Sequence, residues 1–294
     1  MVRWLVCSIA LGLLIGCTRT IGEDDVFLPW MAEGTQFSVT DDDDAVFVAN
    51  RARDGLFEEM GLKIEDTSVP TTIGSLAVRH VLSPEEDVPL FVYCGGNSYD
   101  IPSHGELVTW KVAQHGDLLL WDYPGYGASQ GEARVEDFKL AAKDLAGEIE
   151  SFRRDTAQPV VFWGHSLGGF VCSELAGTTP GAAAIIYEAS APSSEAAITG
   201  AVPWYARPFV RAELDPVLLD FESVNALNGE KLSALVLGAR KDRVLPVKLS
   251  RRLRDDLEAA GHAVSYHEFR KSNHFNIGFD KQLQTVVGSF VATL

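Results

Sequence analysis

The stretch that decides the fold is residues 160–170, with the sequence VVFWGHSLGGF. It reads as a short apolar strand, a turn with Ser166 at its tip, and the start of a helix. Gly164, Ser166 and Gly168 have the G-x-S-x-G spacing of a serine held on a sharp strand-to-helix turn. Side chains two residues from the serine would collide with neighbouring backbone there, and glycine removes those collisions. The turn also places Ser166 at a helix N-terminus, where free N–H groups favour developing negative charge.

Length and composition narrow the possible classes of protein. The chain has 294 residues, of which 46% are hydrophobic and 22% charged, as in an ordinary globular protein with a substantial core. Its formal net charge is −16 at pH 7. This charge argues against nucleic acid as a partner, because binding phosphates requires an excess of lysine and arginine.

The first residues look like an export signal. A positive start at residues 1–3 precedes an apolar run over residues 4–15, which is short for a membrane span. Residues 14–17, LIGC, resemble the lipobox of bacterial lipoproteins. An ordinary signal peptide with an incidental cysteine, or a short N-terminal anchor, is the alternative.

The lipobox resemblance implies a membrane-anchored protein. Residues 1–16 would be removed as a signal peptide, and lipid chains on Cys17 would hold the protein to the bacterial cell envelope. Thr18 follows the cysteine in place of aspartate, which in lipoproteins favours the outer membrane, with the body facing the periplasm. Residues 17–58 are then expected to form a tether and N-terminal extension.

Two cysteines, Cys94 and Cys172, lie in the predicted body of the protein. They could form a disulfide in an oxidising periplasm. Two buried free thiols are an equally good interpretation, because both cysteines fall in elements expected to be buried.

The pattern from residue 59 to the C-terminus predicts one α/β domain. Residues 62–66 and 76–82 alternate between polar and apolar and favour antiparallel opening strands. Downstream, apolar runs alternate with helical stretches, which is typical of a mostly parallel, doubly wound sheet with helices on both faces. Besides the strand before Ser166, the expected buried strands cover residues 89–93, 117–121, 182–187, 232–238 and 263–269, and the expected helices cover 103–114, 134–154, 247–260 and 277 to the end.

Residues 189–230 interrupt this alternation and form a candidate cap insertion. An insertion at the carboxyl ends of parallel strands lies over the ligand crevice. Trp204, Tyr205 and Phe209 are therefore candidate substrate-binding residues. The alternative is a surface excursion whose aromatic side chains only pack on the body.

A serine hydroxyl needs a base and a group that holds the base. Asp242 follows the strand expected at 232–238, and His274 follows the strand expected at 263–269. Their order along the chain, Ser166, Asp242, His274, matches the order of the α/β-hydrolase triad. Among the other histidines, His165 is adjacent to the serine along the chain and is expected to point elsewhere.

A tetrahedral oxyanion needs two backbone donors. The N–H group of Leu167 follows the nucleophile directly. The second donor is expected in the loop after strand 89–93, where we assign Asn97, with Gly96 or Ser98 as alternatives.

These residues together resemble the α/β-hydrolase superfamily of serine hydrolases, in its ABHD-type and S33-like branch. Residues 122–131, DYPGYGASQG, and the elbow GHSLGG resemble segments of that branch. The loop Gly95-Gly96-Asn97 resembles its His-Gly-Asn motif, with Gly95 where histidine is usual. The resemblance covers roughly residues 60–294 and implies an α/β-hydrolase fold with a short cap insertion.

The expected activity is hydrolysis of a carboxylic ester or thioester, on a small-molecule or lipid-like acyl substrate, without metal or cofactor. A serine at the elbow argues against epoxide hydrolase or dehalogenase chemistry, which uses a carboxylate there. The first alternative is an S33-like peptidase or amidase, with Glu188, Glu195 or Glu213 as candidate groups for a substrate ammonium. The second is a lipid-anchored binding protein without activity.

Overall fold

The computed structural model describes residues 19–29, 51–52, 54–201 and 212–294. The predictions for the signal peptide and Cys17 therefore lie outside the described residues. So do those for the cap aromatics Trp204, Tyr205 and Phe209.

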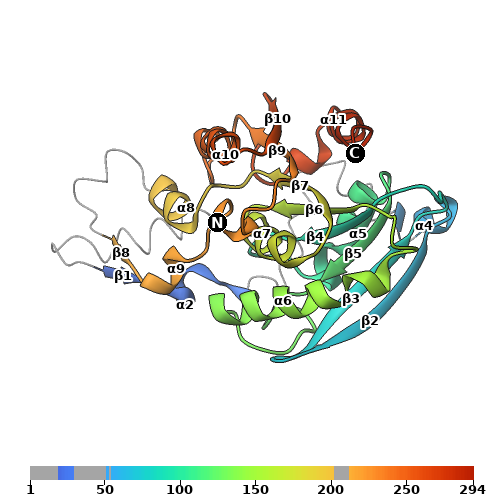
Figure 1. The fold of residues 1–294 in the computed structure, drawn as a ribbon, viewed down its shortest axis with the longest axis horizontal. Coiled ribbons are helices and arrows are strands. Elements are labelled where there is room, and N and C mark those ends of the chain that lie inside the picture. Colours follow the sequence, from blue (N-terminus) through green and yellow to red (C-terminus); the bar gives the residue numbers. More distant parts are fainter. Residues whose placement is uncertain (1–18, 30–50, 53, 202–211) are drawn as a thin grey trace.

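Among the described residues, eight strands form one twisted sheet in the order β10-β9-β7-β6-β4-β5-β3-β2 (Figure 1). β2 and β3 form an antiparallel hairpin, β3 is antiparallel to β5, and the remaining neighbours are parallel. This confirms the prediction of a mostly parallel sheet with antiparallel opening strands. The bounds are β2 Lys63–Thr71, β3 Gly74–Leu82, β4 Leu90–Cys94, β5 Asp117–Trp121, β6 Val160–His165, β7 Ala182–Glu188, β9 Ser233–Ala239 and β10 Ala263–Phe269.

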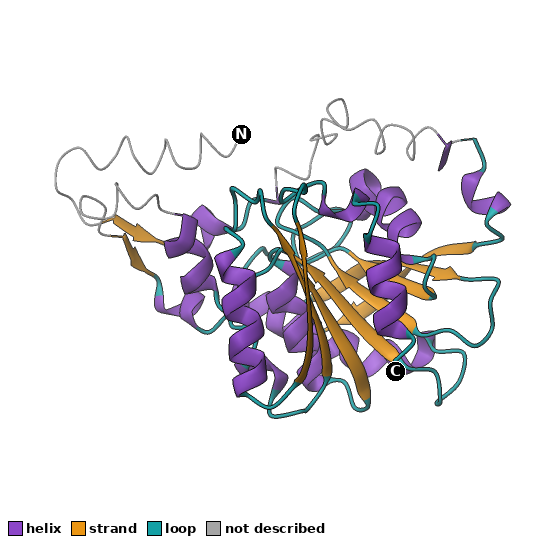
Figure 2. Cartoon of the chain, turned by 90° about the horizontal axis from the view of Figure 1, so that it is seen from above, coloured by secondary structure: helices purple, strands orange, loops and turns teal. Residues whose placement is uncertain are grey.

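Helices cover both faces of the sheet and enclose two apolar cores (Figure 2). Side chains alternate along each buried strand, so that Phe162 of β6 joins one core and Trp163 joins the other. This double burial explains why the central strands read as continuous apolar runs. The first core receives α6 (Val135–Phe152), α7 (Gly168–Thr178) and α10 (Lys248–Ala259), and the second receives α5 (Ile101–Val112) and α11 (Leu283–Val291).

The last helix differs from its prediction. A single helix was expected from residue 277, but the chain forms a short 3₁₀ turn, η4 (Ile277–Phe279), before α11 begins at Leu283. Asp280 separates the two, because its side chain accepts a hydrogen bond from the N–H group of Gln282 at 3.1 Å. Such a local side-chain bond favours a turn over a continuous helix.

The N-terminal segment and the insertion pack together at one end of the molecule (Figure 1). Here β1 (Arg19–Ile21) pairs in parallel with β8 (Ala212–Leu214). Phe27 is buried, with its ring centroid 4.9 Å from that of Phe138 on α6 and 6.3 Å from that of Phe221 in the insertion. The other short elements are α2 (Glu23–Val26), α4 (Leu56–Glu59), α8 (Ser194–Ala201), α9 (Pro216–Leu219) and η3 (Asn225–Leu227).

None of the helices in the described part of the chain combines the length and the apolar character required to cross a membrane.

Candidate active site

Ser166 sits at the tip of a sharp turn between β6 and α7. Its φ angle is +55°, a left-handed conformation that is uncommon for a residue with a side chain. Its N–H group donates to the carbonyl oxygen of Glu188 at 2.9 Å, and its own carbonyl accepts from Ser190 Oγ at 2.9 Å. Backbone strain at one position, held by hydrogen bonds from the neighbouring strand end, is typical of a functional turn.

The glycines around Ser166 are required by close backbone approach. A Cβ at Gly164 would lie 2.3 Å from the carbonyl oxygen of Gly168, and a Cβ at Gly168 would lie 2.0 Å from that of Cys94. Both distances are far below van der Waals contact with backbone that cannot move aside. Glycine is therefore required at both positions, as the G-x-S-x-G spacing predicts.

The structure brings the three predicted triad residues together. His274 Nε2 lies 2.9 Å from Ser166 Oγ, and His274 Nδ1 lies 2.7 Å from Asp242 Oδ2. The side chains of His274 and Asp242 are 5% and 1% exposed, respectively. Each of the three residues follows a parallel strand, and the carboxyl ends of β6, β9 and β10 meet at the same edge of the sheet.

Asp242 is held in place by the backbone that follows it. Its Oδ1 accepts hydrogen bonds from the N–H groups of Val244 and Leu245, both at 2.8 Å. The other oxygen, Oδ2, is left to face His274 Nδ1. A carboxyl group anchored in this way fixes the ring orientation and favours the tautomer in which Nδ1 donates to it and Nε2 faces the serine hydroxyl.

The loop after β4 lies against the nucleophile, as an oxyanion hole requires. A Cβ at Gly96 would lie 3.7 Å from Ser166 Cβ and 2.9 Å from His165 Nδ1. Within the described part of the chain, the main-chain N–H groups of Leu167 and Asn97 donate no hydrogen bond. Both donors are therefore open to a substrate oxygen.

The side chain of Asn97 points to the N-terminal segment. Its Nδ2 donates to the carbonyl oxygen of Val26 at 2.6 Å. Its Oδ1 accepts from the N–H group of Leu28 at 3.4 Å and from Tyr126 OH at 2.7 Å. The sequence carried no signal for this arrangement, because the partners lie up to 71 positions away.

The side chain of His165 contacts the main chain of His274, and the partner of Ser166 Oγ is His274. Its Nε2 lies 3.0 Å from the carbonyl oxygen of His274, and the two ring centroids are 5.0 Å apart. Burial lowers the pKa of His165 to about 4, so the ring is neutral at pH 7. A carbonyl oxygen can only accept a hydrogen bond. Nε2 of His165 therefore carries the single ring proton and donates a hydrogen bond to the main-chain carbonyl oxygen of His274.

A buried ion pair lies below the elbow. Lys111 Nζ is 2.8 Å from Glu188 Oε2, and the two side chains are 9% and 2% exposed. The same carboxylate accepts from Trp163 Nε1 at 2.7 Å, and Lys111 also donates to Tyr93 OH at 3.1 Å. Burial alone would raise the pKa of Glu188. The Lys111 ammonium and the other partners together outweigh this effect, so the pKa of Glu188 lies below its usual value.

Cys94 and Cys172 form a disulfide, with their Cα atoms 5.8 Å apart. The bond joins the last residue of β4 to the middle of α7. It therefore clamps the strand that leads into the Gly95–Asn97 loop to the helix that follows Ser166. Of the two alternatives that the sequence left open, pairing is the one realised.

Asp122, in the segment before α6, holds a second turn close to the site. Its Oδ1 accepts from the N–H group of Ile101 at 2.6 Å, and its Oδ2 accepts from that of Ala128 at 3.1 Å. A Cβ at Gly127, whose φ angle is +50°, would lie 2.1 Å from Oδ2. Burial raises the pKa of Asp122 to about 6, and the two backbone bonds only partly oppose this shift.

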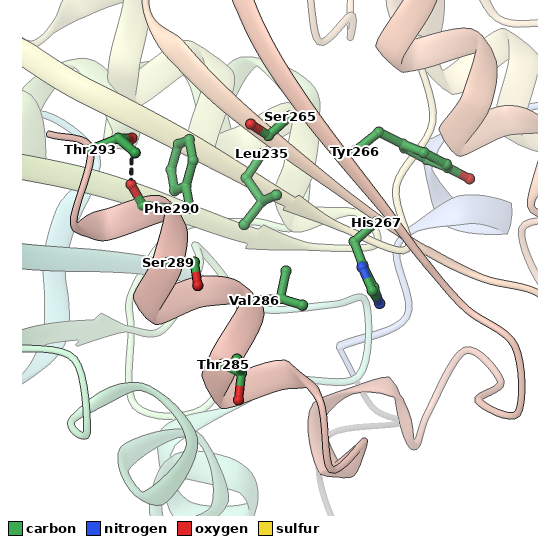
Figure 3. A pocket seen from close by; sticks show the side chains of 9 residues that line it. All are labelled: Leu235, Ser265, Tyr266, His267, Thr285, Val286, Ser289, Phe290 and Thr293. Carbon is green, nitrogen blue, oxygen red and sulfur yellow. Dashed lines mark hydrogen bonds between the residues drawn. The ribbon is translucent and has the colours of Figure 1, made fainter.

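A separate hollow of about 310 Å³ lies between β10 and α11 (Figure 3). Val286 and Phe290 of α11 and Leu235 of β9 line it, with Ser265 and His267 on β10. It contains none of the triad residues.

In the described ranges, no group of three or more histidine, cysteine, aspartate or glutamate residues has the arrangement of a metal site.

The strand order, the elbow after β6 and the positions of Asp242 and His274 define an α/β-hydrolase fold. Solved structures agree. The chain is similar to the Pyrococcus furiosus esterase Pf2001, with a TM-score of 0.61 and 14% identity over 81% of this chain and 93% of that one. It is also similar to a Pyrobaculum calidifontis esterase, with a TM-score of 0.57 and 16% identity over 91% and 97%.

Sequence comparisons match part of the chain. The model of the serine aminopeptidase S33 family matches residues 103–218, a segment that contains Ser166 but ends before Asp242 and His274. Two uncharacterized proteins of Mycobacterium tuberculosis, from strains CDC 1551 and H37Rv, are each 31% identical over 171 residues. The matched region is 56% of this chain and 56% of each relative, so the chain spans about half the length of the curated relatives it matches.

Proposed function

We propose that this protein is a serine hydrolase that cleaves carboxylic esters or thioesters through an acyl-enzyme. The observation that carries the proposal is the continuous hydrogen-bond relay from Ser166 Oγ to His274 at 2.9 Å and from His274 to Asp242 at 2.7 Å. Such a relay supplies an activated nucleophile, a general base and a group that holds the base, on a fold whose solved relatives include esterases.

The geometry supports a two-step mechanism. Ser166 Oγ attacks the carbonyl carbon while His274 Nε2 takes its proton, and the carbonyl electron pair moves onto oxygen. The N–H groups of Leu167 and Asn97 then stabilise the oxyanion. The intermediate collapses and expels the alcohol or thiol, which leaves with the proton from His274. Water repeats the sequence on the acyl-serine, with His274 again as base and Asp242 stabilising the imidazolium.

Short p-nitrophenyl esters test the proposal. Ser166→Ala is expected to lower kcat by at least about 10³-fold, because the remaining donors cannot replace the nucleophile. Asp242→Asn is expected to lower kcat, because the ring of His274 then lacks its negative partner. Thermal stability is expected to change little. Hydrolysis by Ser166→Ala at the wild-type rate would refute the proposal.

The match to the serine aminopeptidase S33 model favours a second candidate, an aminopeptidase. An aminopeptidase needs an acidic group for the substrate ammonium. Glu188 is a poor candidate, because Lys111 already neutralises it in a buried pair. Glu195 and Glu213 are exposed on α8 and β8. Parallel assays of amino-acid p-nitroanilides and matched p-nitrophenyl esters separate the two reactions, and we expect ester cleavage to exceed anilide cleavage.

The acyl substrate is proposed to be a small molecule or a lipid-like molecule. The insertion at 189–230 follows β7, at the edge of the sheet where Ser166 lies, and this position suits a cap over the acyl group. A chain-length series of esters and thioesters measures the preference. If kcat/KM is independent of acyl length between two and twelve carbons, an apolar acyl site is ruled out.

We further propose that the protein is a lipid-anchored component of the bacterial cell envelope, attached through Cys17. The LIGC pattern supports this location, and so does the Cys94–Cys172 disulfide, because disulfides persist mainly in oxidising compartments. Cys17→Ser is expected to abolish incorporation of an alkyne-tagged fatty acid and to release the protein from the membrane fraction. Labelling that survives Cys17→Ser would contradict the proposed anchor.

A further inference from the structure

Residues 19–29, here called the strap, connect the insertion to the loop that carries the candidate oxyanion donor. At one end, β1 pairs with β8, and Ile21 accepts a hydrogen bond from the N–H group of Asp215 at 2.9 Å. At the other end, Val26 and Leu28 hold the side chain of Asn97. The strap therefore runs from β8 of the insertion to the side chain of Asn97 within residues 19–28.

The strap is packed onto the body along its length. Ile21 and Phe27 are buried, and Phe27 makes edge-to-face contacts with Phe138 and Phe221. Glu23 Oε1 accepts a hydrogen bond from the N–H group of Val135 at 2.6 Å, at the start of α6. This apolar and polar docking fixes the strap relative to the sheet.

The Asn97 amide is the point where the strap reaches the site. Its carbonyl oxygen and its amide nitrogen are both engaged, by Leu28 and Tyr126 on one side and Val26 on the other. Asn97 directly follows Gly96, which lies against Ser166 and His165. An oxyanion donor has to be held within about 0.5 Å of its productive position by supporting contacts. The main chain of the loop is held at two further points, since the carbonyl oxygen of Gly95 accepts from Tyr123 OH at 2.7 Å and that of Gly96 accepts from the N–H group of Tyr99 at 3.0 Å.

We propose that the strap is a positioning element for the oxyanion hole: by holding the Asn97 side chain, it sets the main-chain N–H group of Asn97 toward the oxyanion. The inference rests on the proposed hydrolase function and deepens it. It assigns a role in transition-state binding to an N-terminal segment that lies outside the part of the chain matched by the S33 model.

The test compares Phe27→Ala, Asn97→Ala and their double variant, with Phe290→Ala as the control. Phe290 is buried on α11 and lines the hollow away from the triad, so its truncation removes the same aromatic ring without touching the strap. Each variant is assayed with p-nitrophenyl butyrate for kcat and KM. Binding of a trifluoromethyl ketone, which forms a hemiketal oxyanion on the serine, is measured in parallel.

Phe27→Ala and Asn97→Ala are each expected to lower kcat about 10- to 100-fold, with KM changed less than threefold. Ketone affinity should fall in proportion to kcat/KM, because both report oxyanion binding. The double variant should lose no more activity than the more severely impaired of the two single variants, because both changes act through the same amide. Phe290→Ala should lose thermal stability but keep kcat.

The inference is overturned if Phe27→Ala affects kcat no more than Phe290→Ala, or if the losses of the two single variants multiply in the double variant. If Phe27→Ala does not fold, Phe27→Leu loosens the same contact and is judged by the same criteria. Failure of the proposed function is recognised separately, because wild-type activity would then survive Ser166→Ala.

Discussion

Lys111→Met removes the ammonium that lies 2.8 Å from the Glu188 carboxylate and leaves a side chain of similar length. The Glu188 side chain, 2% exposed in the wild type, keeps Trp163 Nε1 as a neutral donor but loses the cation in contact with it. Removing one partner of a buried pair costs about 3–5 kcal/mol, because the remaining charge keeps its desolvation penalty. We expect the free energy of unfolding of Lys111→Met to fall by about that amount at pH 8.

The loss should depend on pH, with a definite sign. Without Lys111, burial is the largest influence on Glu188 and raises its folded-state pKa above the unfolded value. An acid with a raised folded pKa binds protons more tightly in the folded state, so the variant regains stability as pH falls through that pKa. The deficit relative to wild type should therefore shrink between pH 8 and pH 5.

Urea unfolding followed by tryptophan fluorescence at pH 8 and pH 5 measures both effects. Lys111→Met/Glu188→Gln is the matched control, since it removes the uncompensated charge and should recover most of the stability at pH 8. A Lys111→Met deficit below about 1 kcal/mol at both pH values would refute the reasoning, because the pair would then contribute no more than a surface ion pair.

Three further predictions concern other parts of the site. Reducing the Cys94–Cys172 disulfide, which closes a loop of 78 residues, should lower the free energy of unfolding by about 4 kcal/mol; an unchanged melting temperature after reduction, with thiols verified by mass spectrometry, would contradict this. His165→Ala removes the hydrogen bond to the carbonyl oxygen of His274 and should lower kcat about 10- to 100-fold with KM unchanged, whereas His165→Gln should recover part of the loss. Equal kcat values for both variants and the wild type would show that this hydrogen bond does not position His274. Asp122 has a pKa of about 6 when folded and therefore binds its proton more tightly in the folded state. The free energy of unfolding of the wild type, relative to that of Asp122→Asn, should rise by about 1 kcal/mol as pH falls from 7.5 to 5. If chemical unfolding shows the same difference between the two proteins across that range, the shifted pKa is contradicted.

The sheet and the convergence of Ser166, Asp242 and His274 at one edge of it could be predicted because their signals are local. Each buried strand is a short apolar run, and the candidate catalytic residue lies a few positions after it, as Asp242 does after β9 and His274 after β10. The parallel arrangement then brings the strand ends together without further information. The predicted bounds of β5 and β10 agree with the structure.

What could not be predicted depends on pairs that are distant along the chain. Lys111 and Glu188 are 77 positions apart, and Asn97 and Val26 are 71 apart. Periodicity shows that a segment is buried but not which polar groups meet within the core. The partner of the His165 ring could not be predicted for the same reason, because it is the main chain of His274, 109 positions away.

The central claim is that Ser166 is a nucleophile activated by His274, and its rate of reaction with a fluorophosphonate tests this most directly. Intact-mass spectrometry followed by peptide mapping gives both the rate and the labelled residue. We expect one phosphonyl group per chain, on Ser166, with labelling absent in Ser166→Ala and slowed at least about 100-fold in His274→Ala. Labelling of His274→Ala at the wild-type rate, or a label on another residue, would contradict it.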